Sequence, residues 1–231
     1  MKRILVAIAA IFIFNIAFSQ VKFGVKFGAN LASVSDVKGK AGGVSVDVYD
    51  NDGISFGFLA GAFTNISFGE FLAFQPELLF SMQGGKQKFS SDLLEGRESA
   101  NHGMRYKFNY INLPLLLEIK IFDSGLGVLI GPQFGLNVYN SLEFMLEEKS
   151  GSEFDNLCQE SFGGSPERFD MSLAMGLQYT LDHLIIGLRY NRGLTDHLNT
   201  TRIIIDDFNQ IKANYSGWKN NVFQLSFSWF F

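Results

Sequence analysis

The sequence has little cysteine, the residue with which small domains most often form disulfides or bind zinc. It contains a single cysteine, Cys158, in 231 residues, which excludes an intramolecular disulfide framework and a zinc site built of thiolates. Only 18% of the residues are charged and the formal net charge is −4, so a strongly charged, disordered chain is excluded. A nucleic-acid partner is excluded as well, because binding phosphates needs a clustered basic surface.

What the sequence does contain is phenylalanine and glycine, with 25 and 24 residues, against only four prolines. A helical protein would use alanine, leucine, glutamate and lysine at many of these positions. Aromatic residues favour the half-buried, pleated surface of a β-sheet. The composition therefore predicts strands rather than helices.

The first 19 residues are typical of a secretory signal peptide. A positive region at Lys2 precedes an apolar run over residues 4–17, and small residues lead to a cleavage point ahead of Gln20. The run is shorter than the roughly 20 residues that a membrane-spanning helix needs, and no longer run follows. We expect residues 1–19 to be removed and residues 20–231 to form one exported domain, which can lie in a membrane only as a barrel.

Apolar and polar residues alternate along eight segments of this domain. A period of two places the apolar side chains on one face of a strand and glycine, serine, asparagine and glutamine on the other. The eight segments are residues 21–30, 54–66, 71–82, 105–121, 128–138, 169–180, 184–191 and 223–231.

The segment 105–121 is the least regular of the eight. Its early aromatic residues, among them Tyr110, share one phase, whereas its later leucines share the other. One extra residue would shift the facing of everything after it, so we expect a β-bulge near Ile111–Asn112. Bulges are also the expected accommodation for the prolines inside strands, Pro76, Pro114 and Pro132, although nothing separate accounts for Pro132.

The connections between the segments alternate between short and long. Short turns fall at residues 67–70, 122–124 and 181–183, and long loops at residues 33–53, 83–104, 140–168 and 194–219. In an up-and-down barrel all short turns then lie at one rim and all long loops at the other, as in bacterial outer-membrane barrels. We therefore expect an all-β, eight-stranded, antiparallel transmembrane β-barrel with short periplasmic turns and four long extracellular loops.

The two faces of the strands indicate which one meets lipid. A soluble barrel would bury its apolar face and show a charged surface to water. Here the second face is rich in glycine and amides and carries few charges, which suits a barrel interior better than a soluble surface. We expect the apolar face to contact outer-membrane lipid.

Several motifs resemble those of the outer-membrane β-barrel family that contains the PorT-like proteins. They are Gly28-Ala29-Asn30, Gln75-Pro76-Glu77-Leu78-Leu79-Phe80-Ser81, Tyr110-Ile111-Asn112-Leu113-Pro114-Leu115-Leu116-Leu117, Gly131-Pro132 and Leu188-Arg189-Tyr190-Asn191-Arg192-Gly193-Leu194. The resemblance implies the fold of the small eight-stranded barrels. It brings no common catalytic residues, and through the family name it implies a part in protein secretion.

Residues suited to catalysis or metal binding do not form a recognisable constellation. His102, His183 and His197 lie in two different loops and one short turn, and a catalytic histidine needs a positioned partner. The acidic third loop, from Glu143 to Glu167, lacks the ligand spacing of a calcium loop. We predict no catalytic, cofactor-binding or metal-binding residues and no enzyme activity; a small barrel enzyme stays open only if His102 or His197 finds a partner.

The polar face is expected to fill the barrel. Eight strands enclose a space just wide enough for side chains, so opposite charges there should pair, for example Glu77 with Arg189. The residues expected to point inward are Lys22, Lys26, Gln75, Glu77, Asn137, Asp170, Gln178 and Arg189. A narrow channel is therefore the lesser alternative.

The function that we expect is that of a structural, adhesion or interaction platform that presents its extracellular loops to a protein partner. The alternative is an accessory component of a protein-secretion system. The C-terminal strand ends at Phe231, where a terminal aromatic residue resembles the signal that the barrel-assembly machinery recognises. This strand should close the barrel against the first one, which leaves no edge exposed in lipid.

Overall fold

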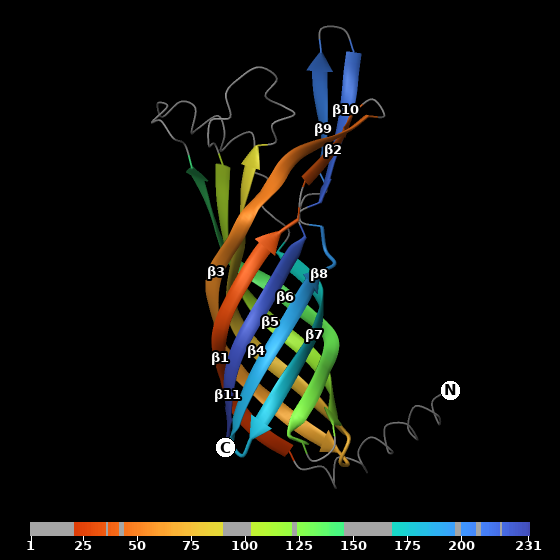
Figure 1. The fold of residues 1–231 in the computed structure, drawn as a ribbon. Helices are drawn as coiled ribbons and strands as arrows, with labels where there is room; N and C mark the ends of the chain where they lie inside the picture. Colours follow the sequence, from red (N-terminus) through yellow and green to blue (C-terminus); the bar gives the residue numbers. More distant parts are fainter. Residues whose placement is uncertain are drawn as a thin grey trace, which may run out of the picture.

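The chain folds as a tall antiparallel β-barrel (Figure 1). The computed structural model describes residues 21–35, 37–41, 44–89, 103–121, 124–145, 168–196, 200–206, 209–217 and 219–231. Residues 1–19, the expected signal peptide, lie outside them. Within the described part of the chain, no helix is long and apolar enough to cross a membrane.

Eight strands form the wall of the barrel. They are β1 (Val21–Val34), β3 (Val44–Phe68), β4 (Leu72–Phe89), β5 (Gly103–Ile121), β6 (Leu126–Met145), β7 (Phe169–Leu181), β8 (Leu184–Gly193) and β11 (Asn220–Phe230). Each pairs antiparallel with its neighbours in the order β1-β11-β8-β7-β6-β5-β4-β3, and β1 also pairs with β3. The ring is therefore closed, and the expected eight-stranded up-and-down barrel is confirmed.

The last strand closes the ring as expected. The pairing of β11 with β1 runs without a break from Gly24 opposite Phe230 to Val34 opposite Asn220. One residue further, the backbone N–H of Phe231 donates to the carbonyl of Phe23 at 2.9 Å. Every wall strand thus has a hydrogen-bonded neighbour on both sides, as lipid requires.

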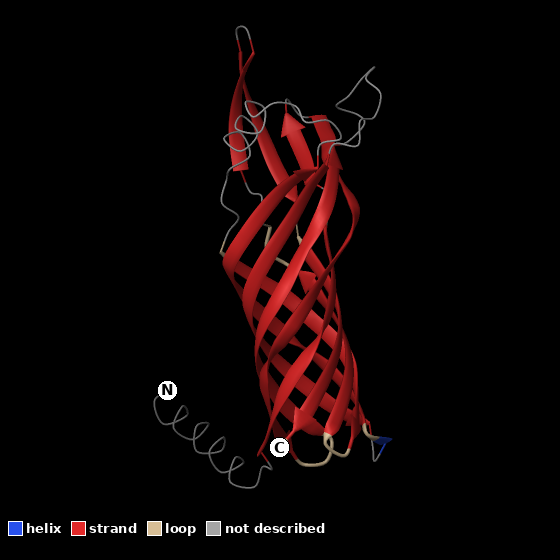
Figure 2. Cartoon of the chain, turned by 90° about the vertical axis from the view of Figure 1, so that its left-hand side faces the viewer, coloured by secondary structure: helices blue, strands red, loops and turns tan. Residues whose placement is uncertain are grey.

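The long connections hold more strand than expected. The strands β2 (Val37–Ala41), β9 (Thr200–Asp206) and β10 (Asn209–Gly217) lie inside the expected loops 33–53 and 194–219. They extend the sheet from β3 in the order β3-β2-β10-β9. Figures 1 and 2 show this extension rising above the barrel at the end opposite the C-terminus.

The short turns lie together at the other rim, beside the C-terminus (Figure 2). The β3–β4 turn passes through Gly69 at a φ of 72°, a conformation that favours glycine. The β7–β8 turn places Asp182 at a φ of 47°, which an aspartate tolerates better than most residues. The alternation of short and long connections that the sequence predicts is confirmed. In outer-membrane barrels the rim with the short turns faces the periplasm.

Side chains alternate between the two sides of the wall along most of each strand. The outer face is apolar, with exposed residues that include Phe27, Phe58, Leu113, Leu136, Leu177, Leu188, Phe223, Leu225 and Trp229. The inner face is buried. Besides apolar residues such as Leu59, Leu79 and Leu116, it carries Lys26, Asn30, Gln75, Glu77, Asn112, Glu118, Gln133, Asn137, Asp170, Ser172, Gln178, Arg189, Asn191, Gln224, Ser226 and Ser228. A globular protein in water would have the reverse arrangement, so this wall is built for a lipid solvent.

The bulge expected near Ile111–Asn112 is wrong. β5 keeps a single phase, so Phe108 and Tyr110 are buried on the inner face together with the polar residues that follow. Space for the ring comes from the neighbouring strand, because a Cβ atom on Gly135 would lie 3.2 Å from Tyr110 Cδ1. The aromatic residues therefore fill the interior and do not belong to the lipid-facing phase.

The irregularity lies instead in the partner strand β6, opposite Asn109 and Tyr110 of β5. Asn109 pairs with Tyr139, but Tyr110 pairs with Asn137. Val138 is thus the extra residue of a bulge in β6, and both Val138 and Tyr139 are exposed.

The prolines do not sit at bulges either. Pairing between β4 and β5 is interrupted for two residues beside Pro114, and pairing between β5 and β6 is interrupted for two residues beside Pro132. In both places it resumes in the same register, and the register of β4 is also unchanged across Pro76. Each proline costs local pairing, because it has no N–H to donate, but it does not reset the side chains that follow.

A charge placed on the outer face tests the assignment of lipid contact. Leu188, in the middle of β8, is 60% exposed, and Leu194, just past its end, is 47% exposed. We expect Leu188→Arg to lower the free energy of unfolding in lipid vesicles by about 2–4 kcal/mol, and Leu194→Arg by about 1 kcal/mol or less. Equal losses in urea titrations of the two variants would place Leu188 outside the hydrocarbon layer.

The single cysteine offers a test of orientation. Cys158 lies in the long connection between β6 and β7, on the side that we assign to the cell exterior. A membrane-impermeant maleimide should label it on intact cells. A protein carrying both Cys158→Ser and Ser124→Cys should react only after the outer membrane is permeabilised, because Ser124 lies between β5 and β6 at the opposite rim. The reverse pattern would invert the barrel.

Candidate functional site

The centre of the interior is an ion cluster around one carboxylate. Arg189 on β8 donates two hydrogen bonds to Glu77 on β4, from Nη1 to Oε2 at 2.9 Å and from Nη2 to Oε1 at 2.7 Å. Lys26 on β1 forms a second ion pair with Oε1 of the same carboxylate. All three side chains are buried, and the contact between Glu77 and Arg189 that the sequence predicts is confirmed.

A hydrogen-bonded chain leads from this cluster toward the rim with the short turns. Gln75 Nε2 donates to Glu77 Oε1 at 2.8 Å, and the Gln75 Oε1 atom accepts from Asn65 at 3.2 Å and from Gln178 at 3.4 Å. The same two amides donate to Glu118, each at 2.7 Å. Two buried carboxylates on different strands are thus connected through amide side chains.

The charges of this inner layer balance. Lys26 and Arg189 contribute two positive charges, and Glu77 and Glu118 contribute two negative ones. A buried charge without compensation is costly, and Glu77 alone would leave one of its two cations uncompensated. Glu118 offsets the surplus without touching either cation, so the four formal charges of this layer sum to zero.

A second polar cluster lies on the side of the long loops. Asn30 donates to Ser81 Oγ at 2.9 Å and to the Met82 carbonyl at 2.8 Å, and its own oxygen accepts from Gln224 at 3.1 Å. Gln83 donates to Ser81 at 3.0 Å and accepts from Asn220 at 2.7 Å. Five strand-borne side chains, those of Asn30, Ser81, Gln83, Asn220 and Gln224, therefore brace one another across the interior.

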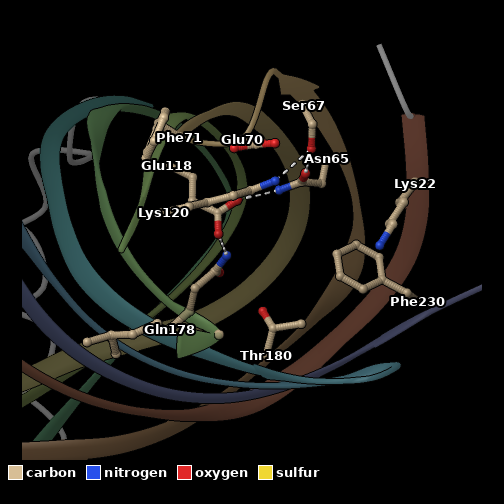
Figure 3. Close-up of a pocket in the computed structure, with 12 residues that line it drawn as sticks. Lys22, Asn65, Ser67, Glu70, Phe71, Glu118, Lys120, Gln178, Thr180 and Phe230 are labelled. Carbon is tan, nitrogen blue, oxygen red and sulfur yellow. Dashed lines mark hydrogen bonds between the residues drawn. The ribbon is translucent and has the colours of Figure 1, made fainter. Parts of the chain in front are cut away.

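Below the polar chain, the interior opens into a pocket at the rim with the short turns (Figure 3). Its volume is about 430 Å³. It is lined by Lys22, Asn65, Ser67, Glu70, Phe71, Glu118, Lys120, Gly125, Leu126, Gln178, Thr180 and Phe230. Of these, only Lys22 and Gln178 were expected from the sequence to point inward. Glu118 and Lys120 were not among the predicted residues, although their alternation with Ile119 and Ile121 places them on the inner face.

The remaining candidates from the sequence are not brought together. His183 lies in the β7–β8 turn and stacks on Trp229, with ring centroids 5.7 Å apart. His102, His197, Cys158 and the acidic residues of the third loop beyond Glu143 lie outside the described residues. Of the eight residues expected to point inward, all but Lys22 are buried; Lys22 lies at the mouth of the pocket. Among the described residues, no group of three acidic, histidine or cysteine side chains could hold a metal ion.

With the closed barrel and its polar interior established, the sequence can be compared with known families. Residues 16–199 match the model of a family described as the outer membrane protein beta-barrel domain. The chain belongs to this family. It is therefore an integral β-barrel of the bacterial outer membrane, whereas the PorT-like resemblance within the family stays a prediction.

Solved structures with a similar course of the chain include outer-membrane proteins of low sequence identity. Ail, the attachment invasion locus protein of Yersinia pestis, was solved with the heparin analogue sucrose octasulfate. It is 13% identical, covers 92% of this chain and 99% of its own, and gives a TM-score of 0.40. Neisserial surface protein A is 13% identical, covers 90% of this chain and 96% of its own, and gives a TM-score of 0.35. The outer membrane protein AlkL is 15% identical, covers 92% of this chain and 90% of its own, and gives a TM-score of 0.38. No curated protein matches the sequence.

Removing the negative charge of Glu77 tests how much the ion cluster contributes to the stability of the barrel. Glu77→Gln keeps the shape of the side chain but leaves Lys26 and Arg189 buried beside each other without their shared counter-charge. We expect it to lower the free energy of unfolding in lipid vesicles by about 3–5 kcal/mol. Glu70→Gln, at the exposed turn, should change it by about 0.5 kcal/mol or less. Identical urea midpoints for the two variants would contradict the role of Glu77.

Proposed function

We propose that this barrel is a membrane-anchored interaction platform, whose working surface is the sheet extension and the long connections on the extracellular side. The observation that carries the proposal is the height of one wall of the barrel. β3 has 25 residues, and β4, β5 and β6 have 18, 19 and 20. A strand of an outer-membrane barrel needs only about 9–11 residues to cross the hydrocarbon layer.

The part of β3 that extends above the closed ring is paired with other strands through its backbone. Beyond the last pair of β3 with β1, at Ser55, the strand continues for eleven residues back to Val44. It pairs there with β2, and β2 pairs with β10. β9 forms the outer edge, because no further described strand pairs with it. Such an edge offers unpaired N–H and C=O groups to an added strand, which is one way in which proteins bind extended peptides.

The filled interior supports the platform over a channel. Across the middle of the barrel, Lys26, Glu77 and Arg189 form contacts too short to admit a water molecule between them. Breaking this buried cluster is costly, because it leaves charges inside the barrel without compensation, and this favours a platform over a channel.

The proposal is tested by replacing residues 200–217 with a short glycine–serine turn. In the described residues, the pairing of this hairpin with the rest of the sheet is confined to β2, so the variant should assemble to the same level and keep the gel mobility of a folded barrel. Cells that carry the variant should lose adhesion to other cells and to matrix-coated surfaces relative to cells that carry the unchanged protein.

Single-channel recordings in planar bilayers complete the test. The unchanged protein and the hairpin variant should both lack a stable open pore. Full adhesion of the hairpin variant, or a stable conductance of the unchanged protein, would overturn the platform and favour transport.

A further inference from the structure

The pocket at the rim with the short turns carries charged groups that the ion cluster of the interior does not use. Lys22, Glu70, Glu118 and Lys120 all line it. Within the described part of the chain, no ion pair joins any of the four to an opposite charge. One pocket therefore presents two ammonium groups and two carboxylates without pairing them with one another, and this rim faces the periplasm.

Glu118 is the innermost of these groups. Only 4% of its surface is exposed, and its carboxylate lies over Gly127 on the next strand, where an added Cβ atom would come within 2.6 Å of Oε1. Asn65 and Gln178 each donate one hydrogen bond to it, as Figure 3 shows. An ionised carboxylate has about four acceptor positions, so Glu118 keeps capacity for a donor that arrives from the pocket.

The lysines are held apart from this carboxylate. Lys120 lies two residues further along the same face of β5, yet its ammonium group donates to Ser67 Oγ at 2.8 Å (Figure 3). Lys22, on β1, places its ammonium group 5.3 Å from the centroid of the Phe230 ring, a distance at which a cation is attracted to the ring face. The two ammonium groups, together with the exposed carboxylate of Glu70, thus lie toward the mouth of the pocket, and the buried carboxylate of Glu118 lies at its inner end.

We propose that this pocket binds a whole zwitterionic dipeptide from the periplasm. The ammonium group of the ligand would donate to Glu118, and its carboxylate would pair with Lys22 and Lys120. The volume of about 430 Å³ falls within the roughly 300–1,000 Å³ of small-ligand sites. Phe71, Leu126 and Phe230 provide apolar wall for small side chains. The site is separate from the extracellular platform, so either assignment can fail without the other.

The test uses dialanine and two forms of it that each lack one charge. N-acetyl-dialanine has no ammonium group, and dialanine amide has no carboxylate. Each is titrated into the full protein in lipid nanodiscs while backbone amide resonances are followed by NMR. Dialanine should give saturable shifts at Ser67, Lys120 and Thr180, and each blocked form should bind about tenfold more weakly, as expected for the loss of one charge-assisted hydrogen bond.

Variants assign the two halves of the site. In Glu118→Gln, dialanine and N-acetyl-dialanine should bind equally, while dialanine amide remains weaker. In the double variant Lys22→Gln, Lys120→Gln, dialanine and dialanine amide should bind equally. Arg192→Gln, at the opposite rim, is the control and should leave all three dissociation constants unchanged. Gel mobility checks that each variant is folded.

Three outcomes would overturn the proposal. They are equal dissociation constants for the three probes on the unchanged protein, no saturable shift up to about 10 mM dialanine, and full discrimination by the folded Glu118→Gln variant. If Glu118→Gln does not fold, the three probes on the unchanged protein and on the lysine variant still test the proposal. The lysine variant should fold, because both lysines lie at the rim of the barrel.

Discussion

In a lipid bilayer no water molecule replaces a lost backbone hydrogen bond, so a sheet that crosses it must close on itself. The pairing of β1 with both β3 and β11 meets this requirement, and the rest of the structure follows from it. A closed ring has an inner and an outer face, and the pleat sends alternate residues to each. Lipid accepts every apolar side chain on the outside, so the burial problem moves to the inside, where each polar group needs a partner.

Around Glu77 and Glu118, the interior meets this need with a small number of charges and several amides. Glu77 contacts both Lys26 and Arg189, and Glu118 balances the charge that remains. Amide side chains such as Gln75 donate and accept at once, so they connect the carboxylates without adding charge. A register slip of one residue would turn these groups toward lipid, where a charge costs several kcal/mol. The ion cluster thus penalises wrong registers more severely than it stabilises the correct one.

Most of the wall could be predicted from the sequence, because lipid outside and polar groups inside impose a period of two. Prediction failed where an aromatic residue fits either the lipid-facing side or the interior of the barrel. Tyr110 reads as a lipid-facing aromatic residue, but it fills the space that Gly135 leaves empty on a neighbouring strand, and a single sequence does not show which residues lie opposite each other. The sheet extension had a partial signal, since Val44, Val46 and Val48 alternate with polar residues. β9, with three consecutive isoleucines, has no alternation, because that pattern weakens where both faces of a sheet lie outside the bilayer.

The same limit applies to the interior. The pairing of Glu77 with Arg189 could be expected, because opposite charges in a filled space seek each other. The role of Glu118 could not, because its partners Asn65 and Gln178 are neutral and lie 53 and 60 residues away. Two opposite charges on the inner face can be expected to pair however far apart they lie in the sequence. An amide side chain can pair with almost any polar group, so its partner does not follow from the sequence. Cross-barrel amide contacts therefore need the three-dimensional arrangement, and with them the location of the pocket.

The pocket and the ion cluster belong to one hydrogen-bonded system. It runs from Lys120 through Ser67 and Asn65 to Glu118, and from there through the amides of Gln178 and Gln75 to Glu77. A cationic group bound to Glu118 would neutralise the negative charge that offsets the positive surplus around Glu77. The electrostatic potential at Lys26 and Arg189 would then change without any movement of the wall. The system thus joins the rim with the short turns to the ion cluster in the middle of the barrel, and it does so through side chains alone.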